Sequence, residues 1–192
     1  MSLLDSVRRA VAVLSAEGRV GVLVGGLGVS ARAEPRFTRD ADLVVAIDTD
    51  AQAEAVMHAF IVEGYRVQAL LEQSAVDRLS GARMIDPDGI EIDLLTASSG
   101  IEPEIVAAAE EVEVVPGLRV HVAATGHLIA LKLLSVAPGR ETDAADLRAL
   151  ARVADAAEWE RAAVAVALIT ERGFHRGRTL SADLAALRSN AS

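Results

Sequence analysis

The sequence contains no cysteine among its 192 residues. This absence excludes disulfides, zinc sites built from thiolates and a cysteine nucleophile. Aromatic residues make up only 3% of the chain, so we expect an aliphatic core with few rings for stacking on bases. The sequence has no apolar run near the roughly 18 residues of a membrane helix and no charged leader before an apolar segment. We therefore expect a cytoplasmic protein with no membrane partner.

Positive charge is also scarce. The chain has 19 Lys and Arg residues against 28 Asp and Glu residues, which gives a formal net charge of −9 at pH 7, and Lys132 is its only lysine. This balance is not typical of a protein coated for nucleic-acid binding. With 52% apolar residues, a chain of this length is long enough to fold around one good core.

The hydrophobic pattern divides the chain into an α/β part and an all-helical part. In the first part we expect strands at residues 19–24, 42–47, 65–70, 82–85, 90–95, 112–115 and 118–122, and helices at 3–16, 27–33, 50–63 and 102–109. From Thr125 onward only helical spacing occurs, over a segment that ends before Pro138 and at 142–154, 156–171 and 180–187. The prediction is therefore an α/β core over residues 1–123 and a C-terminal helical portion over 124–192, packed on the core.

The glycine pair Gly25-Gly26 ends one apolar run, and Asp40 and Asp42 open the next. Because strand side chains alternate between faces, the two acids project from the same side. Two carboxylates held side by side repel each other unless a cation lies between them. Mg²⁺ prefers such oxygen ligands and usually shares them with substrate phosphates. The glycine pair and the N-terminus of the helix after it leave backbone N–H groups open to a phosphate.

A third acid, Asp93, lies in a short alternating stretch at residues 90–95. The turn signal at residues 86–89 predicts a hairpin that brings this stretch beside the other strands. Glu91 shares the strand face of Asp93, which leaves open that one of the two is a cross-strand ion-pair partner. A glycine turn, paired acids and a distant third acid together indicate metal-dependent phosphoryl or nucleotidyl transfer.

These motifs resemble those of the DNA polymerase β-like nucleotidyltransferase superfamily. The resemblance rests on Gly25-Gly26, on Arg36-x-Thr38-x-Asp40-x-Asp42-Leu43 and on Ile92-Asp93-Leu94-Leu95. Downstream, Leu128-Ile129-Ala130-Leu131-Lys132-Leu133 and Arg140-x-x-Asp143-x-x-Asp146-Leu147 are similar to helical motifs of the AbiEii/AbiGii-type toxin group within it. The family implies an α/β (α+β) fold, with a twisted mixed sheet flanked by helices, and transfer of a nucleoside monophosphate from an NTP to an acceptor.

By this resemblance, Asp40, Asp42 and Asp93 hold Mg²⁺ or Mn²⁺, and Asp93 takes the proton of the acceptor. Lys132 neutralises charge that develops on the phosphates. Many superfamily members have Gly-Ser where this chain has Gly25-Gly26, and we expect Ser30 to take the place of that serine. The residues expected to contact the nucleotide are Gly25, Gly26, Ser30, Thr38, Arg39, Arg140 and Asp143. The toxin group further implies an RNA or protein acceptor and an antitoxin protein as partner.

Structural interpretations stand beside these functional ones. Lys132 is equally consistent with a surface lysine that snorkels, and Asp143 and Asp146 with acids favoured in the first turns of a helix. The basic segment at residues 172–178 is expected to be a solvated charge run, with contact to an acceptor as the less favoured interpretation. The four histidines share no metal-ligand spacing and are expected to be structural.

Two other functions also agree with the sequence. One is a non-catalytic nucleotide-binding or antitoxin-like module. The other is a small-molecule nucleotidyltransferase similar to the aminoglycoside-modifying enzymes, because a cationic acceptor would suit the net charge of −9.

Overall fold

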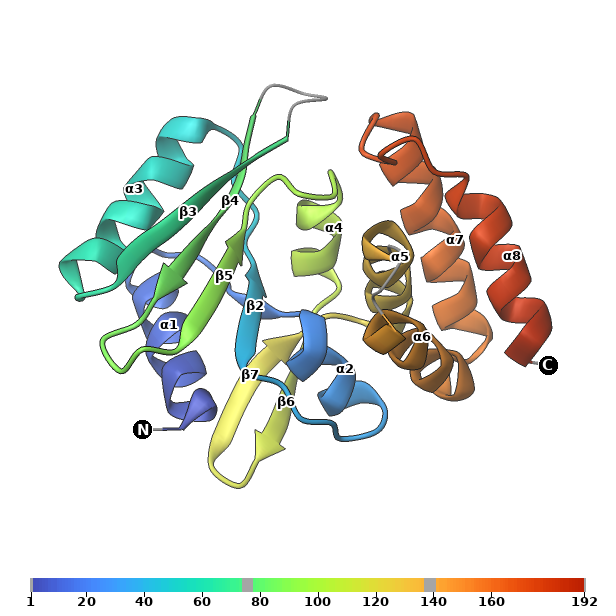
Figure 1. Ribbon diagram of the computed structural model, residues 1–192, viewed down its shortest axis with the longest axis horizontal. Helices are drawn as coiled ribbons and strands as arrows, with labels where there is room; N and C mark the ends of the chain where they lie inside the picture. The colour runs from blue at the N-terminus through green and yellow to red at the C-terminus, as the bar shows by residue number, and fades with distance from the viewer. Residues whose placement is uncertain (1, 74–77, 137–140, 192) are drawn as a thin grey trace.

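The computed structural model describes residues 2–73, 78–136 and 141–191, and it folds into one seven-stranded sheet with helices around it (Figure 1). The strands are β1 (Val22–Leu23), β2 (Asp40–Val44), β3 (Arg66–Gln73), β4 (Arg78–Ile85), β5 (Glu91–Leu95), β6 (Glu110–Val115) and β7 (Leu118–Val122). The helices are α1 (Leu3–Ala16), α2 (Gly25–Arg32), α3 (Asp50–Val62), α4 (Glu102–Ala107), α5 (Thr125–Ser135), α6 (Glu141–Val153), α7 (Ala156–Glu171) and α8 (Leu180–Ala191). Within the described residues, none of these helices has the length and apolarity to cross a membrane.

The sheet has the strand order β3-β4-β5-β2-β1-β7-β6. The pairs β2–β5 and β1–β7 are parallel, and the other neighbouring strands are antiparallel. This arrangement confirms the expected mixed sheet flanked by helices, followed by a helical C-terminal portion. Several boundaries differ from the prediction by a few residues. Two of the differences bear on the site: the first strand is shortened to two residues, and α2 begins at Gly25 instead of residue 27. The glycine pair therefore forms the first turn of α2.

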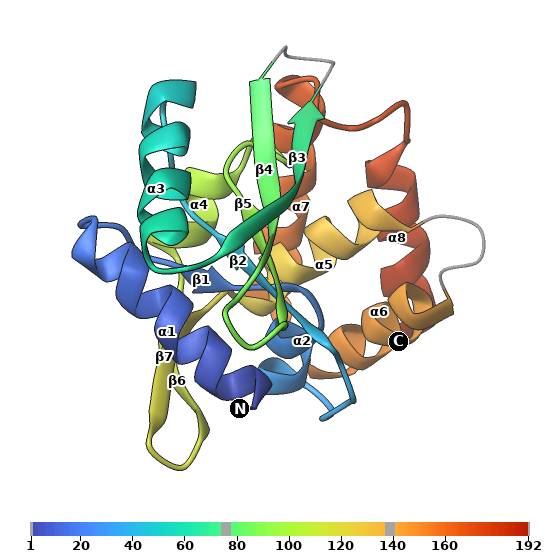
Figure 2. The same ribbon diagram turned by 60° about the vertical axis from the view of Figure 1, so that its left-hand side comes forward.

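Helices cover both faces of the sheet. On one face, α1 and α3 pack through a core that includes Leu14, Phe60 and Met84. On the other face, strand residues such as Val44 share a core with Ile129 of α5 and with residues of α6, α7 and α8. Figures 1 and 2 show α1 and α3 on the opposite side of the sheet from α7 and α8. The helical portion is therefore packed directly on the sheet.

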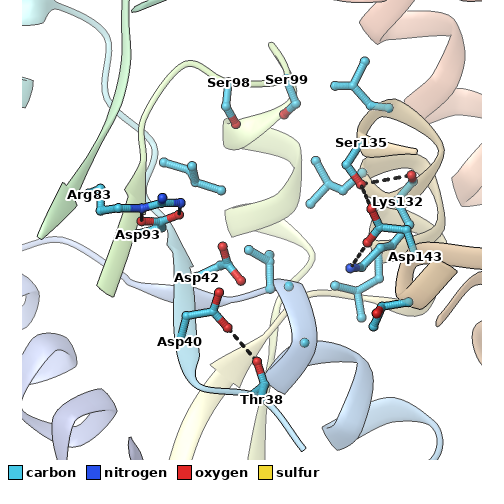
Figure 3. A pocket seen from close by; sticks show the side chains of 18 of the residues that line it. Thr38, Asp40, Asp42, Arg83, Asp93, Ser98, Ser99, Lys132, Ser135 and Asp143 are labelled. Atoms are coloured by element: carbon cyan, nitrogen blue, oxygen red, sulfur yellow. Dashed lines mark hydrogen bonds and ion pairs between the residues drawn. The ribbon is translucent and has the colours of Figure 1, made fainter. Parts of the chain in front are cut away.

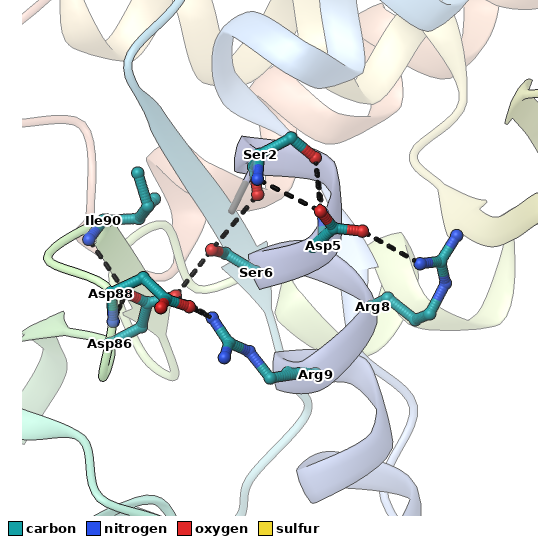
Figure 4. A network of polar contacts seen from close by, with 8 residues as sticks. All are labelled: Ser2, Asp5, Ser6, Arg8, Arg9, Asp86, Asp88 and Ile90. Atoms are coloured by element: carbon teal, nitrogen blue, oxygen red, sulfur yellow. Dashed lines mark hydrogen bonds and ion pairs between the residues drawn. The ribbon is translucent and has the colours of Figure 1, made fainter.

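The turn between β4 and β5 is organised by one buried carboxylate. Asp86 Oδ1 accepts hydrogen bonds from the backbone N–H groups of Asp88 and Ile90, both at 2.8 Å. Asp86 Oδ2 accepts from Ser6 Oγ at 2.5 Å and from Arg9 Nη2 at 2.6 Å, and both donors lie on α1 (Figure 4). Because the turn sets the register of a hairpin, these bonds decide which residues of β4 and β5 face each other.

A close approach of backbones joins α5 to α7. A Cβ atom on Gly126 would lie 2.4 Å from the carbonyl oxygen of Glu158, and the N–H of Gly126 donates to the Glu158 carboxylate at 2.6 Å. The predicted boundary at residues 123 and 124 falls in the link between β7 and α5. A division into separate domains there stays a prediction.

We predict that His127 on α5 makes the stability of the fold sensitive to acid. Its side chain is buried, and Nδ1 has no hydrogen-bond partner among the described residues. Burial, assisted by the charge of Arg161, lowers the pKa of His127 from 6.5 to about 4. Because the depressed pKa belongs to the folded state, the stability is fully present above pH 6.5 and is lost as the pH falls from 6.5 through 4.

The measurement is the free energy of unfolding in urea between pH 7 and pH 4. The wild type should lose about 3 kcal/mol more than His127→Gln over this range. His58→Gln is the matched control, because His58 is exposed, and it should follow the wild type. The prediction would be contradicted if the free energies of unfolding of the wild type and His127→Gln fall by the same amount between pH 7 and pH 4.

Candidate functional site

A cavity of about 490 Å³ lies between the sheet and the C-terminal helices. Its walls come from the start of α2, the loop before β2, the strands β2, β4 and β5, the loop after β5, and the helices α5 and α6. Figure 3 shows acids on the sheet side of this cavity and a lysine with a further acid on the helical side. The structure brings together eight of the predicted site residues here, namely Gly25, Gly26, Thr38, Asp40, Asp42, Asp93, Lys132 and Asp143.

The register of three neighbouring strands places two of the acids side by side. In the parallel pair β2–β5, Asp42 lies opposite Asp93, and in the antiparallel pair β4–β5, Asp93 lies opposite Arg83. Asp40 is two residues before Asp42 on β2 and therefore faces the same side. Segments more than 50 positions apart in the sequence thus contribute carboxylates to one wall.

Asp42 is the most strongly perturbed of these acids. Burial, followed by the negative charges of Asp40 and Asp93, raises the pKa of Asp42 from 3.8 to about 7, although Lys132 and Arg83 act in the opposite direction. Asp40 has a hydroxyl partner, since Thr38 Oγ1 donates to Asp40 Oδ1 at 2.6 Å. A buried carboxylate beside two others is ionised only at a cost, and a cation placed among them would remove that cost.

Asp93 is held by a guanidinium group. Arg83 Nε donates to Asp93 Oδ1 at 2.9 Å, and Arg83 Nη2 donates to Asp93 Oδ2 at 2.8 Å (Figure 3). Arg83 Nε also lies 3.1 Å from Glu91 Oε1. The two alternatives for this strand are therefore both realised: Glu91 is an ion-pair partner, and Asp93 reaches the cavity.

The donor chemistry of this wall fits a hard divalent cation shared with phosphate. Asp40 and Asp42 supply carboxylate oxygens from one strand, next to a glycine turn that a phosphate would approach. Within the described residues, no group of three His, Cys, Asp or Glu side chains is arranged to hold a metal ion. The third carboxylate is instead bonded to Arg83, so the site has two converging oxygen donors and one that is engaged elsewhere.

Gly25 is required by close contact as well as by backbone conformation. Its φ of +55° lies in the left-handed region, and a Cβ atom there would be 1.7 Å from Asp42 Oδ2. No side chain of the described residues caps α2, so the N–H groups of its first turn face the cavity without such a partner. The first turn of α2 and the Asp42 carboxylate therefore lie against each other, as a shared site for phosphate and metal requires.

At Gly26, the ends of two side chains lie where the Cβ atom of a serine would be placed. A Cβ atom on Gly26 would lie 2.6 Å from Arg36 Nη2 and 2.9 Å from Thr38 Oγ1. The guanidinium group of Arg36 and the hydroxyl of Thr38 therefore occupy the space over the start of α2. Arg36 brings positive charge to a place where a serine would bring a neutral hydroxyl.

Lys132 is buried in a network of opposite charges. Lys132 Nζ lies 2.7 Å from Asp143 Oδ1 and 2.8 Å from Asp146 Oδ2. Arg36 donates to both oxygens of Asp146, at 2.7 and 2.9 Å. The side chain of Lys132 is only 12% exposed, so it is not a snorkelling surface lysine. Two cations are thus held at the cavity by acids of α6, and those acids do more than favour the helix dipole.

Three predicted residues are not among those brought to the cavity. The hydroxyl of Ser30 donates to the carbonyl oxygen of Gly26 at 3.0 Å, and Ser30 does not line the cavity. Arg39 is exposed and lies over the ring of Phe37, 5.8 Å from its centroid. Arg140 lies outside the described residues. Contacts of these three side chains with a nucleotide stay predictions.

Two basic residues of the cavity were not among the predicted site residues: Arg83 was not considered, and Arg176 belongs to the segment 172–178, for which contact with an acceptor was the less favoured interpretation. Arg83 could have been found from the hairpin, because a turn centred on residues 86–90 places position 83 opposite Asp93. Arg176 lines the cavity from the loop after α7, and it has a φ of 52°, which is rare for a residue other than glycine. Arg176 Nη2 donates to the carbonyl oxygen of Ser98 at 3.1 Å. The position of Arg176 at the cavity depends on tertiary packing, which no local sequence pattern predicts.

The loop after β5 is held by a buried acid. Glu102 Oε1 accepts hydrogen bonds from the backbone N–H groups of Ser98 and Ser99, at 2.8 and 2.7 Å, and from the Ser99 hydroxyl at 2.8 Å. Both serines line the cavity. This loop was absent from the sequence-based site because serine at a strand end has no specific chemical signature.

Comparison with solved structures shows which fold this is. ANT(2″)-Ia in complex with adenylyl-2″-tobramycin matches with a TM-score of 0.53 and 15% identity, over 98% of this chain and 98% of that chain. A solution structure of the antibiotic-resistance factor ANT(2″)-Ia matches with a TM-score of 0.54 and 14% identity, over 97% and 89%. An antigenic nucleotidyltransferase-like protein from Paracoccidioides brasiliensis matches with a TM-score of 0.52 and 16% identity, over 97% and 92%.

Neither the protein-family models nor the curated proteins gave a match. At these identities the structural likeness shows that this chain shares the fold of these nucleotidyltransferases. The narrower resemblance to the AbiEii/AbiGii-type toxin group stays a prediction.

We predict that Asp42→Asn stabilises the protein at alkaline pH when divalent cations are removed. The raised pKa of Asp42 belongs to the folded state, so this carboxyl favours folding below pH 3.8 and loses that contribution as the pH rises through about 7. At pH 8 in EDTA, urea unfolding should show the variant to be about 3 kcal/mol more stable than the wild type, and the difference should shrink towards pH 4. Asp48→Asn, at an exposed acid beyond the same strand, should change little. If the wild type and Asp42→Asn have the same free energy of unfolding at pH 8 in EDTA, this account of the carboxylates is refuted.

Proposed function

We propose that this protein is a Mg²⁺- or Mn²⁺-dependent nucleotidyltransferase, which moves a nucleoside monophosphate from an NTP to an acceptor hydroxyl or phosphate. The observation that carries the proposal is the wall formed by Asp40, Asp42 and Asp93 beside the glycine turn at Gly25-Gly26. The nucleotidyltransferase fold of the whole chain supports it.

In this proposal Asp40 and Asp42 hold the cation, and the hydroxyl of Thr38 orients the carboxyl of Asp40. A divalent cation held there would supply Lewis acidity to the triphosphate. The first turn of α2 receives the triphosphate through its backbone N–H groups. Lys132 and Arg36, fixed by acids of α6, neutralise the negative charge that grows on the phosphates, because such catalysis is largely positioning and electrostatics.

Asp93 serves as the base of the reaction. An oxygen of the acceptor forms a bond to the α-phosphorus, the bond from that phosphorus to the bridging oxygen breaks, and pyrophosphate leaves with its electron pair. The proton of the acceptor goes to the carboxylate of Asp93.

A cationic small molecule is the acceptor that the available observations favour. The net charge of the chain is −9, which would attract a polyamine-like acceptor and repel RNA. A protein of the same fold was solved with adenylyl-2″-tobramycin. An RNA or protein acceptor, a role as the toxin of a toxin–antitoxin pair and an antitoxin partner stay predictions from the sequence resemblance.

The test is transfer of label from each of the four α-³²P-labelled NTPs in the presence of Mg²⁺. Separate reactions contain tobramycin, total RNA or a mixture of proteins as acceptor. We expect label on tobramycin, with Asp42→Ala reducing the rate by about a thousandfold or more, and Asp48→Ala as a matched exposed control with nearly wild-type activity.

Label on RNA or protein alone would overturn the small-molecule acceptor and favour the toxin-like role. The absence of label with every NTP and acceptor would overturn catalysis. Calorimetric binding of an NTP without turnover would then identify the non-catalytic nucleotide-binding module.

A further inference from the structure

Arg83 lies opposite Asp93 in the β4–β5 pair and binds its carboxylate. Its guanidinium group forms two parallel hydrogen bonds to Asp93, at 2.9 and 2.8 Å. Bidentate pairs of this kind fix the orientation of a carboxylate as well as its charge. Figure 3 shows Asp93 paired with Arg83, whereas Asp40 and Asp42 lie outside that pair.

The strand register by itself brings Asp93 next to Asp42. Asp42 and Asp93 occupy facing register positions on β2 and β5, so their backbones place them correctly for a shared cation. Even so, no three acids of the described chain are arranged to hold a metal. The carboxylate of Asp93 is bonded instead to Arg83, from a register position that faces Asp42.

Arg83 has a second acid within reach. Its Nε lies 3.1 Å from Glu91 Oε1, and the side chains of Arg83 and Glu91 are 40% and 31% exposed. A guanidinium group in this position can leave Asp93, remain paired with Glu91 and face solvent, so that no charge is left buried without a partner. Asp93, whose side chain is only 10% exposed, has no comparable freedom.

We propose that Arg83 is a positioning residue that acts as a latch on Asp93, which it holds until a divalent cation takes its place. This inference rests on the proposed metal-dependent function and adds a competition to it. Binding of the cation requires exchange of the Arg83–Asp93 pair for a metal–carboxylate contact, so the affinity for free metal is reduced by the stability of that pair.

The experiment is a titration of the full chain with Mn²⁺ in the absence of nucleotide, with free Mn²⁺ followed by electron paramagnetic resonance. Arg83→Met removes the two parallel N–H donors of the guanidinium group and its positive charge. This variant should bind Mn²⁺ about tenfold more tightly than the wild type. Arg83→Lys keeps the charge but cannot make two parallel bonds, and it should also bind more tightly than the wild type. Arg119→Met is the matched control, since Arg119 forms a cross-strand pair with Glu111 at 3.0 Å away from the cavity.

A double-variant cycle ties the effect to the third acid. In the Asp93→Asn background, Arg83→Met should give no gain in Mn²⁺ affinity, because the carboxylate that Arg83 releases is missing. Circular dichroism establishes that each variant is folded, and Arg83→Lys carries the test if Arg83→Met does not fold.

Three results would overturn the latch. If Arg83→Lys binds Mn²⁺ like the wild type, charge alone controls affinity. If the gain persists in the Asp93→Asn background, or if all variants bind equally, Asp93 is not the group released, and the proposed transfer reaction still stands. If no folded variant binds Mn²⁺, the carboxylate site is not a metal site, and the proposed function falls together with the latch.

Discussion

Repulsion among carboxylates on adjoining strands is the constraint on which the rest of this site depends. Asp42 is half-buried next to Asp40 on its own strand and opposite Asp93 on the next one. A fold driven by stability alone would not place three acids on one buried wall. The surroundings limit the cost with Arg83 on one side and Lys132 on the other, and they leave room between the acids and the helical portion for a ligand.

The elements around this wall hold its strands in register. α1 fixes the β4–β5 turn through Asp86, and that turn sets Arg83 opposite Asp93. The start of α2 lies against Asp42 because Gly25 lacks a Cβ atom. On the far side, α6 supplies the acids that hold Lys132. Helices from both ends of the chain therefore act on the same few carboxylates.

Much of this could be predicted from the sequence. Alternating apolar patterns located most strands and helices, and β7 and α7 have the predicted bounds. The spacing of Asp40 and Asp42 indicated a shared face because strand periodicity is local. Arg83 was missed, and the segment that contains Arg176 was expected to be a solvated charge run, because their positions at the cavity follow from strand register and from the packing of the C-terminal helices. The short β1 was overestimated at both ends, because only Val22 and Leu23 pair with β2 and β7, and apolar composition does not reveal where pairing stops.

The central claim is that Asp40 and Asp42 meet a divalent cation beside the glycine turn. Crystals grown with Mn²⁺ and a non-hydrolysable NTP analogue, measured at the manganese absorption edge, test it directly. The account predicts an anomalous peak at ligand distance from both carboxylates, with the triphosphate against the first turn of α2. The claim would be contradicted if manganese and nucleotide bind elsewhere and no anomalous peak lies near Asp40 and Asp42.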